Sequence, residues 1–309
     1  RYAAAAYRET MKEVSELDPL ALHYYQFESE AILERLRRYG KKQCAWGGKA
    51  VRKAMEKNSM RAMRKYTRVV DGRRVIAHDP PVVVPAPEAL AFGQPDGVYV
   101  LFGRYRESLA LEYRMLLDRF EPIDVARKVV GVGSVGTRCL ILLLQAGDGT
   151  PLFLQFKQAT ASVLEPYLGG STYDLCGQRV VEGQRLIQGT SDVLLGWARH
   201  HQQNGESVDF YFRQLWDGKG KLAVEEMAPK CLRAFAGLCG KTLAFAHARS
   251  GDPARIDGYI DDGETFDDAL VAFADRYAEL TAADHDLLVE SIRDGATPVL
   301  SEEEFLATA

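Results

Sequence analysis

Three glycines near the middle of the chain, and the residues that follow them, constrain the fold most strongly. Gly131, Gly133 and Gly136 form the pattern G-x-G-x-x-G. In a dinucleotide-binding domain such a pattern opens a helix, and the pyrophosphate lies on the helix N-terminus. Here an apolar run of strand length follows instead, from Cys139 to Leu144. The pattern therefore predicts a glycine-rich turn between two strands and disfavours a dinucleotide-binding fold.

The chain then turns and returns with one lysine in an apolar strand. Gly147-Asp148-Gly149 marks the turn, and the run from Pro151 to Gln158 is typical of a second strand. Side chains of a strand alternate between its faces, so Lys157 shares one face with Phe153 and Gln155. Leu152, Leu154 and Phe156 take the other face. A lysine is costly to bury without a partner, and we therefore expect an acidic side chain near it.

Two glutamates are candidates for this partner. Glu182 lies in a segment, residues 176–188, that reads as a short helix with Val180, Gly183 and Ile187 on one side. Glu165 is the alternative, but it precedes a proline and is expected in a loop. The order glycine hairpin, lysine strand and glutamate helix favours Glu182.

This order is the one with which protein kinases hold ATP. Backbone amides approach the phosphates, a strand lysine supplies positive charge, and a glutamate of the next helix holds the lysine. A further strand over 209–216 is expected to lead into the hinge beneath the adenine, and two valines are expected to frame the base, Val130 and Val135. The positions expected at the nucleotide are Gly131, Gly133, Ser134, Gly136, Lys157, Glu182, Gln214 and Trp216. The alternative is a surface hairpin with turn glycines and a lysine that reaches out to solvent.

Phosphoryl transfer also needs an acid near the acceptor hydroxyl and groups that hold magnesium. His247 and Asp252 are the candidate catalytic residues, in the segment A-H-A-R-S-G-D. Their spacing differs from that of a kinase catalytic loop, and the alternative interpretation is a helix end with a glycine stop. Asp257, Asp261 and Asp262 are interpreted as a solvated acidic turn rather than a cation site. The sequence therefore predicts no metal-binding residue.

Composition sets the broad class of protein. The chain has 309 residues, of which 47% are hydrophobic and 27% charged, as in an ordinary globular protein of two or three domain-sized units. No apolar run approaches the ~18 residues of a membrane helix, and no signal peptide is present. The five cysteines are scattered without metal-ligand spacing, which indicates reduced thiols. We expect a cytoplasmic protein that does not bind a membrane.

Charge is distributed unevenly along the chain. Residues 35–74 contain 15 lysines and arginines but two acidic residues, whereas residues 252–309 contain 16 acidic residues and three arginines. The basic segment, predicted to form helices and a hairpin, is a candidate surface for a polyanion such as a nucleic acid. A non-catalytic polyanion-binding module is therefore the alternative function, although charge runs are usually solvated faces.

We predict an α+β protein in three regions. Residues 1–122 are expected to be mainly helical, with a tight hairpin over 66–77 and a proline-rich connector over 78–87. Residues 123–217 are expected to form the glycine-hairpin antiparallel sheet with one helix, and residues 218–309 a helical region. Further predicted helices cover residues 1–16, 104–120, 231–247, 266–277 and 281–292.

Several long motifs resemble one bacterial family, known as domain of unknown function 2252. They are K-V-V-G-V-G-S-V-G-T-R-C, P-L-F-L-Q-F-K-Q, S-V-L-E-P-Y, R-V-V-E-G-Q-R-L-I-Q and A-H-A-R-S-G-D. The resemblance extends over nearly the whole chain and is strongest from Asp124 to Asp252. That family is similar to the protein-kinase-like superfamily, which implies ATP and magnesium as cofactors and an unidentified phosphoryl acceptor.

The resemblance also implies where the remaining chemistry lies. In the family, stretches that resemble catalytic and metal-binding loops precede the segment matching Arg1, so the kinase-like parts would be in permuted order. The chain is therefore expected to be a fragment: the nucleotide-binding part of a kinase-like phosphotransferase. If the upstream loops do not catalyse transfer, the protein would be a pseudokinase that binds nucleotide only.

Overall fold

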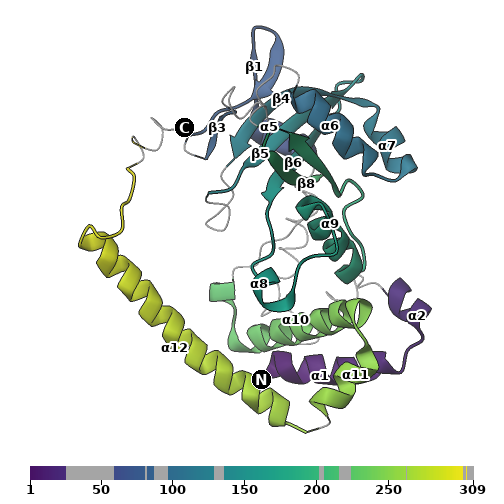
Figure 1. Cartoon of the computed structure of the whole chain (residues 1–309), viewed down its shortest axis with the longest axis vertical. Helices are drawn as coiled ribbons and strands as arrows, with labels where there is room; N and C mark the ends of the chain where they lie inside the picture. The colour runs from purple at the N-terminus through teal and green to yellow at the C-terminus, as the bar shows by residue number, and fades with distance from the viewer. Residues whose placement is uncertain are drawn as a thin grey trace. The chain divides into compact units, whose positions relative to one another are not determined.

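The computed structural model describes residues 1–25, 59–80, 82–86, 97–128, 136–201, 205–215, 224–261, 263–301 and 304. It is an α+β protein with a two-stranded and a six-stranded antiparallel sheet (Figure 1). The chain forms two compact units. Unit 1 comprises residues 1–51, 186–190 and 221–303, and unit 2 comprises residues 52–185, 191–220 and 304–309. Both units combine segments that are distant in the sequence. The division into three consecutive regions stays a prediction.

Unit 2 is built on the six-stranded sheet, whose strand order is β3-β4-β5-β6-β8-β7. The strands are β3 (Val83–Pro85), β4 (Phe120–Lys128), β5 (Cys139–Ala146), β6 (Pro151–Ala159), β7 (Gly196–His201) and β8 (Ser207–Gln214). β5 and β6 confirm the predicted strand–turn–strand, and β8 confirms the strand expected near residue 209. After β6 the chain crosses to the edge of the sheet as β7. It then returns as β8, which lies between β6 and β7.

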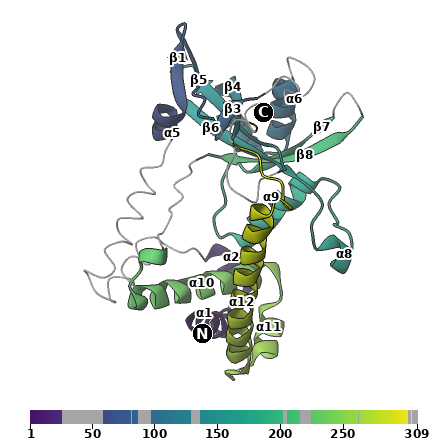
Figure 2. The same cartoon turned by 90° about the vertical axis from the view of Figure 1, so that its left-hand side faces the viewer.

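The two faces of this sheet carry separate cores. On one face, leucines and phenylalanines of β5, β6 and β8 pack against α6 (Gly97–Glu107) and α7 (Leu111–Leu117). Tyr105 of α6 stacks on Phe212 with ring centroids 4.2 Å apart. On the other face, Ile141 and Phe153 pack against α5 (Ser59–Tyr66). Figure 2 shows α5 and α6 on opposite sides of the sheet.

One strand edge of the sheet is covered by the α6 segment. The hydroxyl of Ser108, just after α6, accepts a hydrogen bond from the backbone N–H of Trp197 in β7 at 2.9 Å. Arg104 of α6 donates to the carbonyl oxygen of Arg199 in β7 at 2.8 Å. Both groups belong to the strand at the end of the sheet, so α6 satisfies part of its open edge.

The small sheet is the predicted hairpin, with β1 (Thr67–Val70) paired to β2 (Arg73–Ile76). The two turn residues have positive φ, 50° at Asp71 and 76° at Gly72. Positive φ at both central residues is the hallmark of a type I′ turn, which matches the twist of the strands. The Asp-Gly signal is therefore confirmed.

A single predicted helix over 104–120 is wrong. The structure has α6 and α7 with a break at residues 108–110, and Phe120 already begins β4. The apolar stripe continues through the break because both helices pack on the same core. In unit 2 the chain also forms α8 (Glu165–Leu168) and the predicted helix over 176–188, which is α9 (Cys176–Ile187).

Unit 1 consists mainly of helices. They are α1 (Tyr2–Ser15), α2 (Pro19–Tyr24), α10 (Pro229–Ser250), α11 (Pro253–Ile260) and α12 (Thr265–Arg293), with a short 3₁₀ turn at Val224–Glu226. Met11 and Val14 of α1 pack with Phe245 of α10 and Ile260 of α11. The two helices predicted over 266–277 and 281–292 are one continuous helix, because Ala278, Glu279 and Leu280 between them favour helix.

α1 and α10 approach each other closely at Gly240. A Cβ at this glycine would lie less than 3.0 Å from the carbonyl oxygen of Ala3. The missing side chain therefore sets the distance between the helices. Gly237, one turn earlier in α10, has no such restriction, since a Cβ there would lie 3.8 Å from the Cβ of Ala6.

We expect Gly240→Ala to lower the thermal unfolding midpoint of the protein, with a loss of about 1–3 kcal/mol, as overpacking of a core usually costs. Gly237→Ala is the matched control. It should be neutral or stabilising by about 0.5–1 kcal/mol, because alanine favours helix over glycine. Differential scanning calorimetry of the two variants gives the comparison, and equal midpoints would contradict the close approach.

Candidate functional site

Lys157 lies near the C-terminal end of β6, the strand that was predicted to carry it. In the sheet it is paired with Cys139 of β5 and with Tyr211 of β8. Its face is also that of Phe153 and Gln155, while Leu152, Leu154 and Phe156 belong to the opposite core, so the predicted alternation is confirmed. Lys157 is half-buried.

Helix α9 packs on the same face of the sheet as Lys157. Cross-strand partners share a face, and Lys157, Tyr211 and Trp197 are successive partners across β6, β8 and β7. A Cβ at Gly177, in the first turn of α9, would contact the Cβ of Trp197 and clash with the backbone of Phe210. The glycine therefore lets α9 lie directly on this face. Sheet face and helix are arranged as the sequence predicted.

The predicted ion pair between Lys157 and Glu182 is not what the structure shows. The carboxylate of Glu182 accepts a hydrogen bond from Arg185 at 3.1 Å, and no ion pair joins it to Lys157 among the described residues. Arg185 lies three residues further along α9, where side chains of a helix are neighbours. The guanidinium carbon of Arg185 lies 5.6 Å from the ring centre of Trp197, and the guanidinium donates a hydrogen bond to the carbonyl oxygen of Leu195. These two contacts hold Arg185 in place.

The alternative partner, Glu165, is also engaged elsewhere. It begins α8, and its carboxylate accepts a hydrogen bond from the backbone N–H of Ser162 at 2.8 Å. This bond closes the turn that precedes the helix. Neither of the two glutamates considered from the sequence therefore neutralises Lys157.

Two other cations share the face with Lys157. Lys128 ends β4, and by alternation it lies with Ala126, which belongs to this face. Arg213 in β8 is the cross-strand partner of Gln155, two residues before Lys157. We call Lys128, Lys157 and Arg213 the cationic row. In the described part of the chain, no carboxylate forms an ion pair with any member of the row.

The three cations surround one buried thiol. Burial raises the pKa of Cys139, and the positive charges of Lys157, Lys128 and Arg213 oppose that rise. The side-chain amide of Gln155 donates a hydrogen bond to the sulfur at 3.6 Å. Cys139 and Gln155 are 3% and 4% exposed, so they form a closed floor between the cations.

Burial destabilises the charge on Lys128. The pKa of Lys128 is lowered, first by burial and then by the neighbouring Lys65, while Cys139 and Asp79 act in the opposite direction. Its ammonium lies 5.0 Å from the ring centre of Tyr66, a cation–π contact that offsets part of the lost hydration.

Arg213 has an unsatisfied donor. Its Nε is buried and has no hydrogen-bond partner within the described residues. A buried donor without a partner is costly and is usually satisfied by water or a ligand. A row of cations with such a donor is suited to bind an anion, and arginine in particular holds planar or tetrahedral oxyanions through two N–H groups.

The other predicted nucleotide positions fall into two groups. Gly136 lies at the end of the glycine pattern with φ of 78°, a backbone conformation that favours glycine. Gln214 pairs with Leu154, so its side chain is on the face opposite to Lys157, and its backbone N–H donates to Asp192. Gly131, Gly133, Ser134 and Trp216 lie outside the described residues, as do Val130, Val135 and Asp262.

The candidate catalytic residues His247 and Asp252 have structural contacts in unit 1. The Nδ1 atom of His247 is 2.9 Å from the hydroxyl of Tyr7, and the rings meet edge to face. Asp252 caps α11 by accepting a hydrogen bond from the backbone N–H of Arg255 at 3.1 Å. These contacts favour the interpretation as a helix end, after which a capped helix begins.

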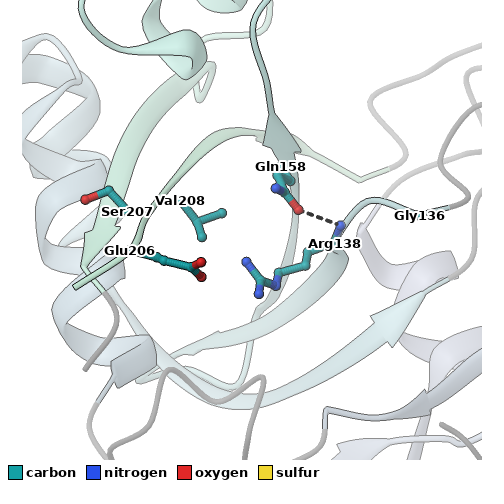
Figure 3. Close-up of a pocket in the computed structure, with 6 residues that line it drawn as sticks. All are labelled: Gly136, Arg138, Gln158, Glu206, Ser207 and Val208. Atoms are coloured by element: carbon teal, nitrogen blue, oxygen red, sulfur yellow. Dashed lines mark hydrogen bonds between the residues drawn. The ribbon is translucent and has the colours of Figure 1, made fainter. Parts of the chain in front are cut away.

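A polar cavity opens on the other face of the sheet. It has a volume of about 550 Å³ and lies where β6 begins to leave β5 and where β8 starts. Figure 3 shows Arg138 and Glu206 directed into it from the segments just before β5 and β8. Gln158 accepts a hydrogen bond from the backbone N–H of Arg138 at 3.2 Å, and Val208 forms part of the wall. Because Gln158 follows Lys157, this cavity and the cationic row are on opposite faces.

The position of α9 depends on the carboxylate of Asp209, which is 6% exposed. It accepts hydrogen bonds from Nε and Nη2 of Arg199 in β7, at 2.6 and 2.9 Å. It also accepts one from the backbone N–H of Cys176, the first residue of α9, at 2.7 Å. Arg199 in turn donates to the carbonyl oxygen of Asp174, and the paired charge raises the pKa of Arg199.

We expect Asp209→Asn to destabilise unit 2 by about 2 kcal/mol, below the 3–5 kcal/mol of a fully buried pair, because Arg199 is partly exposed. The amide replaces a charged acceptor of three N–H groups by one oxygen and a donor. Urea unfolding measures the loss. Asp174→Asn is the control, since the exposed side chain is changed while its backbone contact to Arg199 stays. Equal stability of the two variants would argue against the role of Asp209.

Arg213, Lys128 and Asp209 were missed from the sequence. The available signal was the alternation in β8, where Asp209, Tyr211 and Arg213 recur at every second residue. It shows that they share a face but not which residues of β4 and β6 lie beside them. The register of the sheet supplies that information.

The described residues contain no group of three or more histidine, cysteine, aspartate or glutamate side chains placed to hold a metal ion. No helix in the same part of the chain combines the length and the apolar character needed to cross a membrane.

Comparison with known proteins places the chain in a family. The family profile described as "Uncharacterized protein conserved in bacteria (DUF2252)" matches residues 1–291, so the chain belongs to this family. No curated protein and no solved structure matches it.

Proposed function

We propose that this member of the uncharacterized bacterial family binds the phosphates of a nucleotide, ATP, at the cationic row, as the nucleotide-binding part of a kinase-like phosphotransferase. The observation that carries the proposal is the set of three cations on one sheet face, without a carboxylate partner in the described chain. Cations that are partly desolvated and not neutralised attract anions strongly.

The position of the row supports a phosphate ligand. Lys128 is the last residue of β4 before the glycine pattern, and Cys139 begins β5 just after it. The row therefore lies at the end of the sheet from which the glycine segment departs. In kinases a glycine-rich segment covers the phosphates and a lysine of the third strand contacts them. Lys157 would supply that contact.

Glu182 takes a different role from the one that the kinase comparison implies. Its carboxylate is paired with Arg185, which leaves the ammonium of Lys157 for a ligand. ATP is bound together with magnesium in such enzymes, and the ion would neutralise part of the phosphate charge. Because the described residues hold no cluster of metal ligands, we assign the ion to no side chain of this chain. Nucleotide binding at the row is common to an active phosphotransferase and to a pseudokinase.

The basic surface near α5 supports a second candidate function, polyanion binding. Arg64, Lys65, Arg68 and Arg73 are exposed on α5, β1 and β2. A nucleic acid bound to them would show affinity that falls steeply with salt concentration, because counterions are released. The rest of the basic segment, residues 26–58, lies outside the described residues.

The test is calorimetric titration of the protein with ATP and magnesium. Lys157→Ala should weaken binding roughly 10- to 100-fold, since a hydrogen bond to a charged group contributes about 1.5–3 kcal/mol. Lys230→Ala, an exposed lysine of α10, is the control and should leave the affinity unchanged. An affinity of Lys157→Ala equal to that of the control would refute the role of Lys157. Salt-dependent binding of a DNA or RNA oligomer without ATP binding would favour the second candidate.

A further inference from the structure

We propose that the cationic row is a polyphosphate site, which holds two or three consecutive phosphates with Lys128 and Arg213 as its outer members and Lys157 between them. The inference rests on the proposed function for the nucleotide part of the ligand. It adds the class of anion and two residues that contact it.

The spread of the row across the sheet carries the argument. The strand order places β5 between β4 and β6. The backbones of Lys128 and Lys157 are therefore two strand spacings apart, about 10 Å. Arg213 is on the next strand, diagonal to Lys157, about 7–8 Å away. A single phosphate ion contacts cations within hydrogen-bond distance only. A chain of phosphates can contact all three members, and each contact adds to the affinity.

The floor between the cations favours such a chain. It is formed by the buried side chains of Cys139 and Gln155, and the amide nitrogen of Gln155 is directed at the sulfur. Neither side chain is negatively charged, because burial raises the pKa of the Cys139 thiol and keeps it protonated. The surface beneath the ligand is therefore neutral, and the positive charges at its borders are not screened by it.

Each outer member has a separate reason to contact an anion. Arg213 has its buried Nε without a partner in the described chain, and an oxyanion would accept this N–H together with a second one of the guanidinium. Lys128 is 9% exposed and makes a cation–π contact, but no ion pair in the described chain. A phosphate oxygen would compensate the hydration that this ammonium has lost.

The experiment compares anions of increasing length by calorimetric titration at constant ionic strength. Inorganic phosphate, pyrophosphate, tripolyphosphate and ATP are titrated into the protein, first without and then with magnesium. We expect affinity to rise from phosphate to tripolyphosphate, and tripolyphosphate to compete with ATP. A site that held one phosphate would bind phosphate and tripolyphosphate with equal affinity, and this result would overturn the inference.

The variants Arg213→Gln and Lys128→Gln test the outer members. Each should weaken tripolyphosphate binding about tenfold, because one charged contact is lost, and should weaken phosphate binding less. Arg119→Gln, an exposed arginine of the same unit outside the row, is the matched control and should change nothing. Thermal unfolding of all variants shows whether each is folded, and Arg213→Lys replaces Arg213→Gln if the latter is not.

The outcomes separate this inference from the proposed function. Unchanged tripolyphosphate affinity in both outer variants, with weaker binding in Lys157→Ala, would overturn the polyphosphate site and leave the nucleotide proposal in place. Tripolyphosphate binding that depends on all three cations, with ATP unable to compete, would overturn the nucleotide proposal and leave the polyphosphate site in place. Failure of every phosphate to bind would overturn both.

Discussion

The carboxylate of Asp209 is the contact on which the arrangement of the site depends. One buried group accepts two N–H bonds from Arg199 of the edge strand and one from the start of α9. The two strands and the helix are thereby joined at a single point, and Gly177 allows the helix to lie directly on the strands there. α9 consequently borders the sheet face on which Lys157 lies. The region left between α9 and α5 is the face that carries the cationic row.

Much of the local structure could be predicted because its causes are local. The turn at Asp71 and Gly72, the two strands joined at 147–149, and α9 all follow from turn residues and periodicity. Predictions failed where packing over a long distance decides. The break between α6 and α7 coincides with Ser108, whose hydroxyl is hydrogen-bonded to Trp197, a residue 89 positions away. Conversely, α12 is longer than predicted because nothing in residues 278–280 interrupts a helix.

The site was predictable to a similar extent. Alternation along one strand was enough to place Lys157 on the face of Phe153 and Gln155. The partner of Glu182 was not predictable from the kinase comparison, because Arg185 is closer along the same helix and is also held by Trp197. Lys128 and Arg213 come from strands 85 positions apart in the sequence, and only the register of the sheet brings them to one face beside Cys139.

The cover that α6 provides at β7 has a consequence for how the protein behaves at high concentration. A strand at the border of a sheet presents unpaired backbone groups, and another polypeptide can add to it as an extra strand. Ser108 and Arg104 already occupy an amide and a carbonyl group of β7. An incoming chain would have to displace both before it could pair. The helix that completes the apolar core thus also protects the sheet from self-association and aggregation.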